Sequence, residues 1–142
     1  MIFQIIAAII GTFSFSVLFS IPLEYTPYCA MSGGISWLVY LISTNFCTPT
    51  ISTLVASMVV VFISRILAVY KKSPATLYLI AGIFPLVPGA GIYWTTYYLV
   101  NNDLLTALNT GYSAVKTAMA LVLGIVFVFE IPQQFFNRLF KQ

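Results

Sequence analysis

Two prolines and two glycines close together form the most unusual chemical feature of this sequence. Pro85 and Pro88 lack an amide donor and clash with the preceding helical turn, while Gly89 and Gly91 tolerate almost any backbone conformation. This spacing predicts a break that opens a helix, so that freed carbonyls and amides face one gap. Several secondary transporters hold small zwitterions at such gaps. We expect a ligand or pathway site here, with Tyr93 as a hydroxyl or a wall; the alternative is a proline kink that only serves packing.

A second group of small, weakly polar residues lies earlier in the chain and is a candidate second wall. It contains Ser32 and Gly33, next to Ala30, Gly34 and Ser36. Ala30 and Gly34 have the small-x-x-x-small spacing that lets another helix approach closely. Two interpretations stay open, a substrate-binding wall and plain helix packing, and packing is the preferred one.

Residue types for catalysis or metal binding are nearly absent. The chain has no histidine, and no two acidic residues lie within one hydrophobic segment. No C-x-x-C, H-E-x-x-H or phosphate-loop pattern occurs. Serines such as Ser14 and Ser16 have no histidine base and are typical of helix packing. We therefore expect no enzyme activity, no metal and no cofactor.

The elements that must position these residues are membrane-spanning helices. Of the 142 residues, 61% are hydrophobic and 6% are charged, whereas a soluble domain has roughly 25% charged residues. This composition excludes a soluble enzyme, a secreted module and a disordered chain. A span needs about 20 apolar residues, and long stretches without charge allow about five. We predict an all-α polytopic membrane protein, one transmembrane domain over residues 1–142, with spans at about 3–20, 28–44, 50–70, 75–100 and 112–131.

Prolines and hydroxyl residues indicate where some of these helices begin. Thr48 precedes Pro49 and is a plausible N-cap of the third span. Ser73 is expected to cap the fourth span, with Pro74 at its first helical position. The fourth span then has the proline and glycine motif near its middle, at mid-membrane.

The distribution of lysine and arginine predicts the orientation in the membrane. With five spans, the loop between the third and fourth lies on the same side as the C-terminus, and Arg65 can extend toward that side. The opposite side has Asp103 and, near the start of the fifth span, Lys116. We expect a multi-pass protein of the inner or plasma membrane with the N-terminus outside and the C-terminus in the cytoplasm. The cations on the cytoplasmic side are Lys71, Lys72, Arg138 and Lys141. Two adjacent lysines form no nucleic-acid-binding cluster, so we expect no nucleic-acid partner.

The residues of the broken segment resemble a known family. The run GIFPLVPGAGIY at 82–93, with the upstream pair Ser64-Arg65, is similar to the threonine/serine exporter (ThrE) family, and most closely to its small YjjB-like subunit. The run at 7–22, where Phe19-Ser20 precedes Ile21-Pro22, is similar to the first span of that subunit. The resemblance covers essentially the full chain. Its most specific part is the P-x-x-P-G core.

The second span departs from the family pattern. YjjB-like proteins have a glycine- and histidine-rich step there, whereas this chain has Ser32 to Trp37 without a histidine. A role for that histidine therefore does not transfer.

The resemblance implies a subunit of a secondary transporter that exports small amino acids, threonine- or serine-like, or related carboxylates. The opened helix would hold the substrate carboxylate near the amides of Gly89–Gly91, and the resemblance implies a YjjP-like membrane partner. An odd number of spans agrees with transporters built from two inverted repeats. The competing hypothesis is a non-transport membrane scaffold or assembly subunit. A neighbouring reading frame encoding a partner with a soluble region and further spans would favour the transporter.

Overall fold

The chain is helical throughout the part that the computed structural model describes, residues 2–132. This confirms the all-α prediction. An additional 3-10 turn, η1 (Phe84–Leu86), separates two of the helices. In chain order the helices are α1 (Ile2–Leu18), α2 (Thr26–Ser43), α3 (Pro49–Lys71), α4 (Ala75–Gly82), α5 (Gly89–Val100) and α6 (Leu104–Phe129).

Two helices are long and apolar enough to cross a membrane, α3 with 23 residues and α6 with 26. The pair formed by α4–η1 and α5 adds a third if it is counted as one span, and its two parts are inclined by 49°. With 17 residues, α1 is apolar but shorter, because the chain leaves the helix at Ser20, which has a positive φ. By length and composition, residues 2–132 thus hold two or three spans, fewer than the five predicted. These apolar helices indicate a membrane protein.

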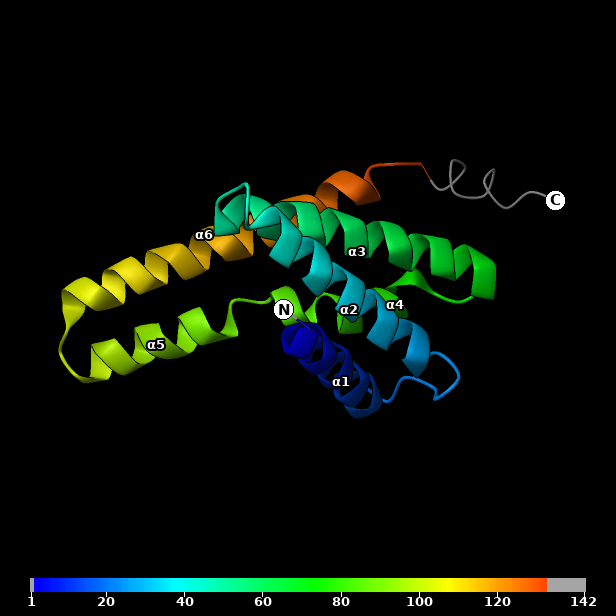
Figure 1. Ribbon diagram of the computed structural model, residues 1–142, viewed down its shortest axis with the longest axis horizontal. Helices are drawn as coiled ribbons and strands as arrows, with labels where there is room; N and C mark the ends of the chain where they lie inside the picture. The colour runs from blue at the N-terminus through cyan, green and yellow to red at the C-terminus, as the bar shows by residue number, and fades with distance from the viewer. Residues whose placement is uncertain (1, 133–142) are drawn as a thin grey trace.

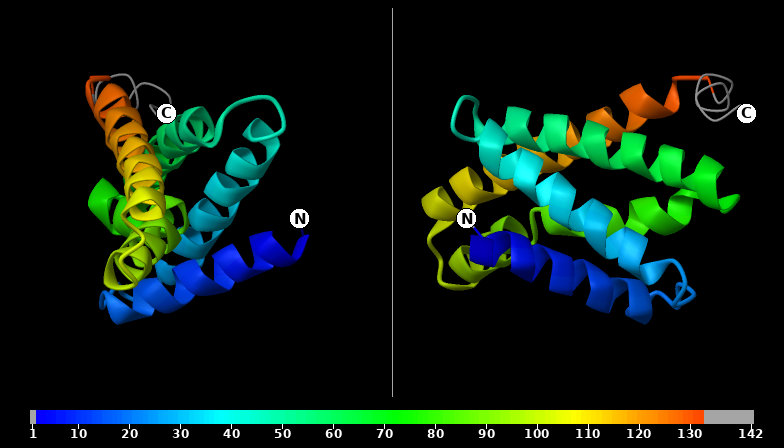
Figure 2. Two further views of the ribbon diagram at one scale, coloured as in Figure 1. Left: turned by 90° about the vertical axis from the view of Figure 1, so that its left-hand side faces the viewer. Right: turned by 45° about the vertical axis from the view of Figure 1, so that its right-hand side comes forward.

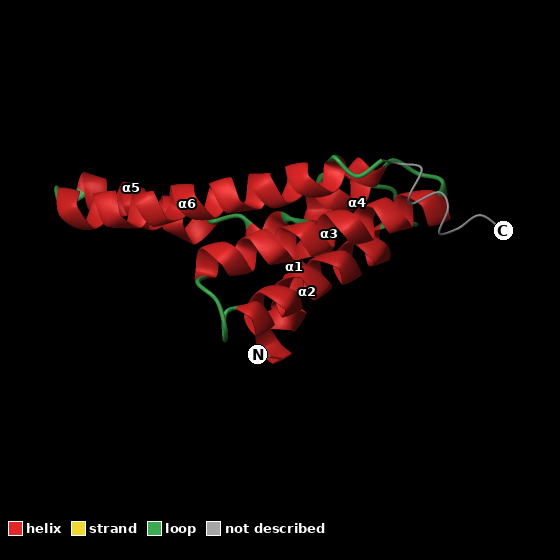
Figure 3. Cartoon of the chain, turned by 90° about the horizontal axis from the view of Figure 1, so that it is seen from above, coloured by secondary structure: helices red, strands yellow, loops and turns green. Residues whose placement is uncertain are grey.

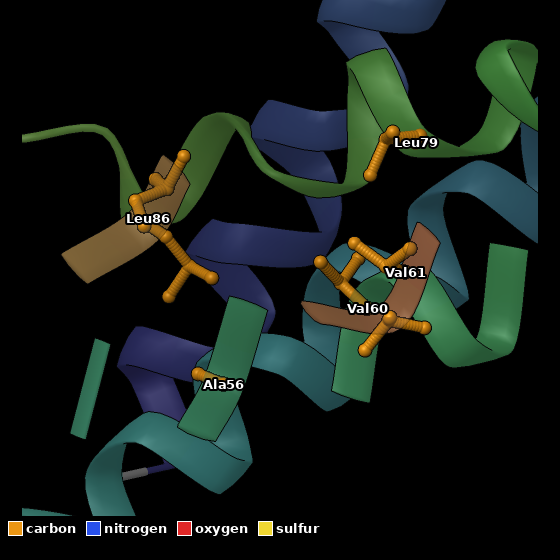
Figure 4. Close-up of a cluster of buried hydrophobic side chains, with 7 residues drawn as sticks. Ala56, Val60, Val61, Leu79 and Leu86 are labelled. Atoms are coloured by element: carbon orange, nitrogen blue, oxygen red, sulfur yellow. The ribbon is translucent and has the colours of Figure 1, made fainter. Parts of the chain in front are cut away.

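The long helix α3 is the centre of the packing. It contacts α2, α4 and α6, while α1 lies against α2 and α4 (Figures 1 and 2). Its residues Ala56, Val60 and Val61 are completely buried and pack against Leu79 of α4 and Leu86 of η1 (Figure 4). The core is therefore built around one face of α3, and the broken segment closes over it.

Small residues set the closest approaches between the helices. A Cβ at Gly124 of α6 would overlap the Ser57 hydroxyl and lie 2.8 Å from the carbonyl oxygen of Leu54, both on α3. A Cβ at Gly82 of α4 would lie 2.7 Å from a methyl carbon of Val60. These helices approach one another as closely as small-residue interfaces allow.

The N-terminal ends of α4 and α6 differ from those predicted from the sequence. Pro74, not Ser73, occupies the N-cap position of α4, because the Ser73 hydroxyl pairs with the Tyr78 hydroxyl at 2.8 Å instead. The helix α6 begins at Leu104 and not at 112, because Asp103 caps it by accepting from the Thr106 amide at 3.2 Å. Gly111 is helical, and Thr95 of α5 packs close to it: a Cβ added at Gly111 would lie 3.1 Å from the methyl carbon of Thr95.

The helices α3 and α6 run in parallel but are staggered along their length. Ser57 lies beside Gly124, and from this contact α6 continues back for about 30 Å to Leu104 whereas α3 continues for only about 12 Å to Pro49. Figures 1 and 3 show α5 and the first part of α6 extending together past α1, α2 and α3. We call residues 89–115 the α5–α6 hairpin. Arg138 and Lys141, on which the predicted orientation partly depends, lie outside the described residues.

Candidate functional site

The chain leaves the helix between Gly82 and Gly89. Pro85 has no amide to donate to the carbonyl of Ala81, and the backbone tightens into η1. Val87 is extended, and Pro88 has φ −75° and ψ 51°. With the Gly89 amide 2.7 Å from the Val87 carbonyl oxygen, Pro88 is the centre of an inverse γ-turn. The two prolines thus stop α4 and redirect the chain into α5.

The backbone groups at this break are only partly satisfied. Ser36 of α2 donates from its hydroxyl to the Gly82 carbonyl at 3.2 Å. At the start of α5, the Pro88 carbonyl accepts from Ile92 at 3.1 Å, and no side chain caps the helix. Among residues 2–132, no acceptor is within hydrogen-bonding range of the Ala90 and Gly91 amides. The N-terminus of α5 therefore presents two free donors together with the positive end of its dipole.

These donors border a cavity of about 770 Å³. It lies between the broken segment, α2, α6 and the first turns of α3. The residues that line it, including four of the predicted site residues, are Trp37, Tyr40, Thr53, Pro85, Leu86, Val87, Pro88, Gly89, Ala90, Gly91, Trp94, Tyr98, Asn109, Thr110, Ser113, Ala114 and Thr117. Because Thr53 is only four residues from the start of α3, the cavity is close to one end of that helix and not at its middle.

The walls of the cavity differ in chemistry. On one side, the Trp37 and Tyr40 rings stack with centroids 5.0 Å apart. On the other side, α6 places Asn109, Ser113 and Thr117 one turn apart along one face. No charged side chain is among the lining residues. The cavity therefore fits a small polar molecule of zero net charge, with its apolar part against the rings.

Several of these polar groups are available for a ligand. The side chains of Asn109 and Ser113 have no hydrogen-bond partner among the described residues. The Thr117 hydroxyl, by contrast, donates to the Ser113 carbonyl at 2.9 Å. The indole Nε1 of Trp37 is buried and also lacks an acceptor in this part of the chain, which is an unfavourable state for a donor.

The sequence-predicted site residues divide into three sets. Pro85, Pro88, Gly89 and Gly91 all line the cavity. Tyr93 is 62% exposed, lies outside the lining and contacts Trp94 edge-on.

The last set comprises Ser32 and Gly33, which are buried in helix packing away from the cavity. The Ser32 hydroxyl donates to the Cys29 carbonyl at 2.8 Å. Gly33 lets α1 pack closely on α2, because a Cβ added at Gly33 would overlap the Thr12 side chain of α1.

The sequence reasoning missed the aromatic wall and the α6 wall. The four-residue spacing of Asn109, Ser113 and Thr117 is a sequence signal, because it places all three on one helix face. The predicted spans leave residues 104–111 in a loop, whereas the structure has them in α6. No local signal brings Trp37 of α2 to the same cavity, since that depends on how α2 packs.

Arg65, the second half of the Ser64-Arg65 pair, is not at the cavity. Its side chain is 5% exposed, and Nη1 donates to the carbonyl oxygens of Val128 at 2.7 Å and Ile131 at 2.6 Å. The guanidinium also lies over the Phe129 ring, 5.7 Å from its centroid. Arg65 therefore caps the end of α6, where a cation is favoured by the helix dipole.

Comparison with known proteins gives one match. The family model described as "Threonine/Serine exporter, ThrE" matches residues 4–131, which covers α2 to α6, all but the first two residues of α1, and the whole cavity wall. The comparisons with curated proteins and with solved structures found no match.

Proposed function

Because the chain belongs to the threonine/serine exporter (ThrE) family, we propose that it is a subunit of a secondary transporter that exports small amino acids, threonine- or serine-like, or related carboxylates. The family supports the transport activity and the substrate class. The cavity at the helix break is the proposed binding site.

The observation that carries this proposal is the pair of free amides at Ala90 and Gly91 beside an uncharged cavity. A helix N-terminus with free amides binds carboxylates well. A zwitterion has no net charge, so it enters a cavity without ionised groups at a smaller cost than an anion or a cation. The carboxylate would bind at the start of α5.

The remaining parts of an amino acid would face the other walls. Asn109 and Ser113 offer an amide and a hydroxyl to a substrate ammonium or hydroxyl group. The Trp37 and Tyr40 rings offer an apolar surface, and an ammonium above a ring is attracted to its face.

The membrane arrangement in this proposal has five crossing segments, with α2 beside α3, α1 against α2, and the α4–α5 pair as one broken span. Lys71 and Lys72, at the end of α3, would lie on the cytoplasmic side, because cations are enriched there. The N-terminus would then be outside and the C-terminus inside, in the inner or plasma membrane. A YjjP-like membrane subunit is the proposed partner, since an odd number of spans suits half of a two-part transporter.

Gly89→Leu tests the binding site. A Cβ at Gly89 meets nothing within 4 Å, so the larger side chain enters open space at the cavity without disturbing the core. Gly11→Leu in α1 is the matched control, because a Cβ there also meets nothing within 4 Å. In cells preloaded with threonine, Gly89→Leu should lower the efflux rate by about tenfold or more, equivalent to about 1.4 kcal/mol. Efflux unchanged in Gly89→Leu, at equal membrane abundance, would rule out this site.

A further inference from the structure

The position of Lys116 in α6 raises a question that the cavity does not answer. The helix runs from Leu104 to Phe129, so Lys116 is at its middle and not near its start. The side chain is exposed and is not part of the cavity wall. Large apolar side chains are exposed on both sides of it, before it at Leu105 and Leu108 and after it at Met119 and Leu123. One cation thus interrupts an apolar face that covers the whole helix.

Two placements of α6 in a bilayer show the difficulty, because neither keeps both Lys116 in water and the apolar side chains in lipid. The hydrocarbon layer is about 30 Å thick, and α6 is about 39 Å long. If the layer covers Leu104 to about residue 123, Lys116 is inside lipid, where an unpaired cation is costly. If the layer begins at Lys116, the apolar α5–α6 hairpin lies in water. In both placements, a protein surface packed over this face would remove the cost.

The chain's own acidic side chains cannot neutralise Lys116. There are three, Glu24, Asp103 and Glu130. Asp103 and Glu130 cap the two ends of α6, each about 20 Å from Lys116 along the axis. Glu24 is in the α1–α2 connection, beside Lys71 at the α3–α4 connection. Within residues 2–132, the ammonium lies over the Tyr112 ring, 5.3 Å from its centroid, and this ring attracts a cation without neutralising it.

A second copy of this chain does not solve the problem. Copies related by an axis along the membrane normal keep each residue at one depth. An inverted copy would exchange the two ends of α6 and leave its middle in place. In both arrangements Asp103 and Glu130 stay at the helix ends, away from Lys116 of the other copy.

From these relationships we infer that the α6 face formed by Leu105, Leu108, Tyr112, Lys116 and Met119 is a docking surface for a helix of a different membrane protein. That helix is apolar and has one aspartate or glutamate at the depth of Lys116. The inference rests on the proposed function only in taking α6 as a membrane helix of a two-part transporter. It identifies the surface and the chemistry of the partner.

Site-specific photocrosslinking in native membranes tests this surface. The photoreactive residue p-benzoyl-phenylalanine replaces Leu108 or Met119, on either side of Lys116, and Ile10 of α1 in the control, where the side chain is also exposed. Positions 108 and 119 should give one adduct with a different protein, and mass spectrometry should place the crosslink in an apolar helix with a carboxylate. Position 10 should not give this adduct. An adduct only with a second copy, only with lipid, or with a helix that has no carboxylate would overturn the inference.

Charge exchange then tests the role of Lys116. Lys116→Glu should lower the adduct yield by about tenfold, and Lys116→Arg should retain it at equal membrane abundance. Changing the partner's carboxylate to lysine in the Lys116→Glu background should restore the adduct. A yield that is insensitive to Lys116→Glu would contradict the proposed pairing. The adduct forms without transport. The crosslinking result therefore tests the α6 surface independently of the binding site, which the efflux of Gly89→Leu tests.

Discussion

The guanidinium of Arg65 on α3 donates to the carbonyl oxygen of Val128 at 2.7 Å, in the last turn of α6. Together with the contact between Ser57 and Gly124, this bond fixes α3 and α6 as parallel neighbours. A helix end in a membrane protein leaves carbonyl groups that need donors. Arg65 supplies a charged donor from a different helix, so it links the end of α6 to the centre of the bundle.

Arg65→Met should destabilise the protein, because it leaves the carbonyls of Val128 and Ile131 without this donor. We expect the free energy of unfolding to fall by roughly 2–3 kcal/mol, as measured by unfolding in mixed detergent micelles. Lys72→Met is the control, since Lys72 is an exposed cation at the end of α3. Equal stabilities of the two variants would show that the Arg65 cap contributes little.

Gly124→Ala should separate α3 from α6. The added methyl group would overlap the Ser57 hydroxyl, and the Leu54 carbonyl behind it cannot move independently of α3. The expected loss is about 1–3 kcal/mol of unfolding free energy. Gly11→Ala in α1 meets no atom within 4 Å and should leave the stability unchanged or raise it by up to about 1 kcal/mol. If both variants behave alike, the close α3–α6 approach is not important for stability.

Asn109→Leu should weaken substrate binding, because it replaces the free amide on the cavity wall by an apolar group of similar size. Loss of one hydrogen bond predicts a rise of about fivefold to tenfold in the threonine concentration that gives half-maximal efflux. Asn101→Leu is the matched control, because Asn101 is in the same hairpin but outside the cavity lining. A rise of the same size in Asn101→Leu would argue against a direct contact.

The first turn of α6 should depend on pH through Asp103. Hydrogen bonds from the side chain and the backbone amide of Thr106 lower the pKa of Asp103 below its usual value. The ionised carboxylate is the better acceptor, so its contribution is complete above the ordinary aspartate pKa of about 3.9. It is lost as the pH falls through the lowered pKa.

NMR of the Thr106 amide checks this dependence. Its chemical shift should titrate with Asp103 in the native protein, and Asp103→Asn should keep the cap but remove the titration. A Thr106 shift that titrates equally in Asp103→Asn would assign the effect to another group.

Much of the broken segment could be predicted from the sequence, because prolines and glycines act on their own backbone. Pro85 and Pro88 stop α4 wherever the neighbours lie, and the break is found between Gly82 and Gly89. The start of α6 could not be predicted in the same way. Gly111 and the polar residues before it are typical of a loop, and their helical state depends on the packing of α5 against them.

The cavity walls and the helix pairs depend on tertiary packing even more. Trp37 reaches the cavity only because small residues let α2 lie close to α1 and to the broken segment. The sequence predicts that Arg65 extends toward water from inside the third span. It reaches the end of α6 instead, since the stagger of α3 and α6 brings those carbonyls within 3 Å.

The turn at Pro88 also has a mechanical consequence. No residue of α5 is buried, and the helix packs chiefly on α6. The core around α3 therefore does not hold α5 in place. With α5 about 18 Å long, a swing of about 10° about Pro88 would move the far end of the helix by about 3 Å. Such a swing would change the width of the cavity entrance while the packed faces of α3 and α4 stay in place.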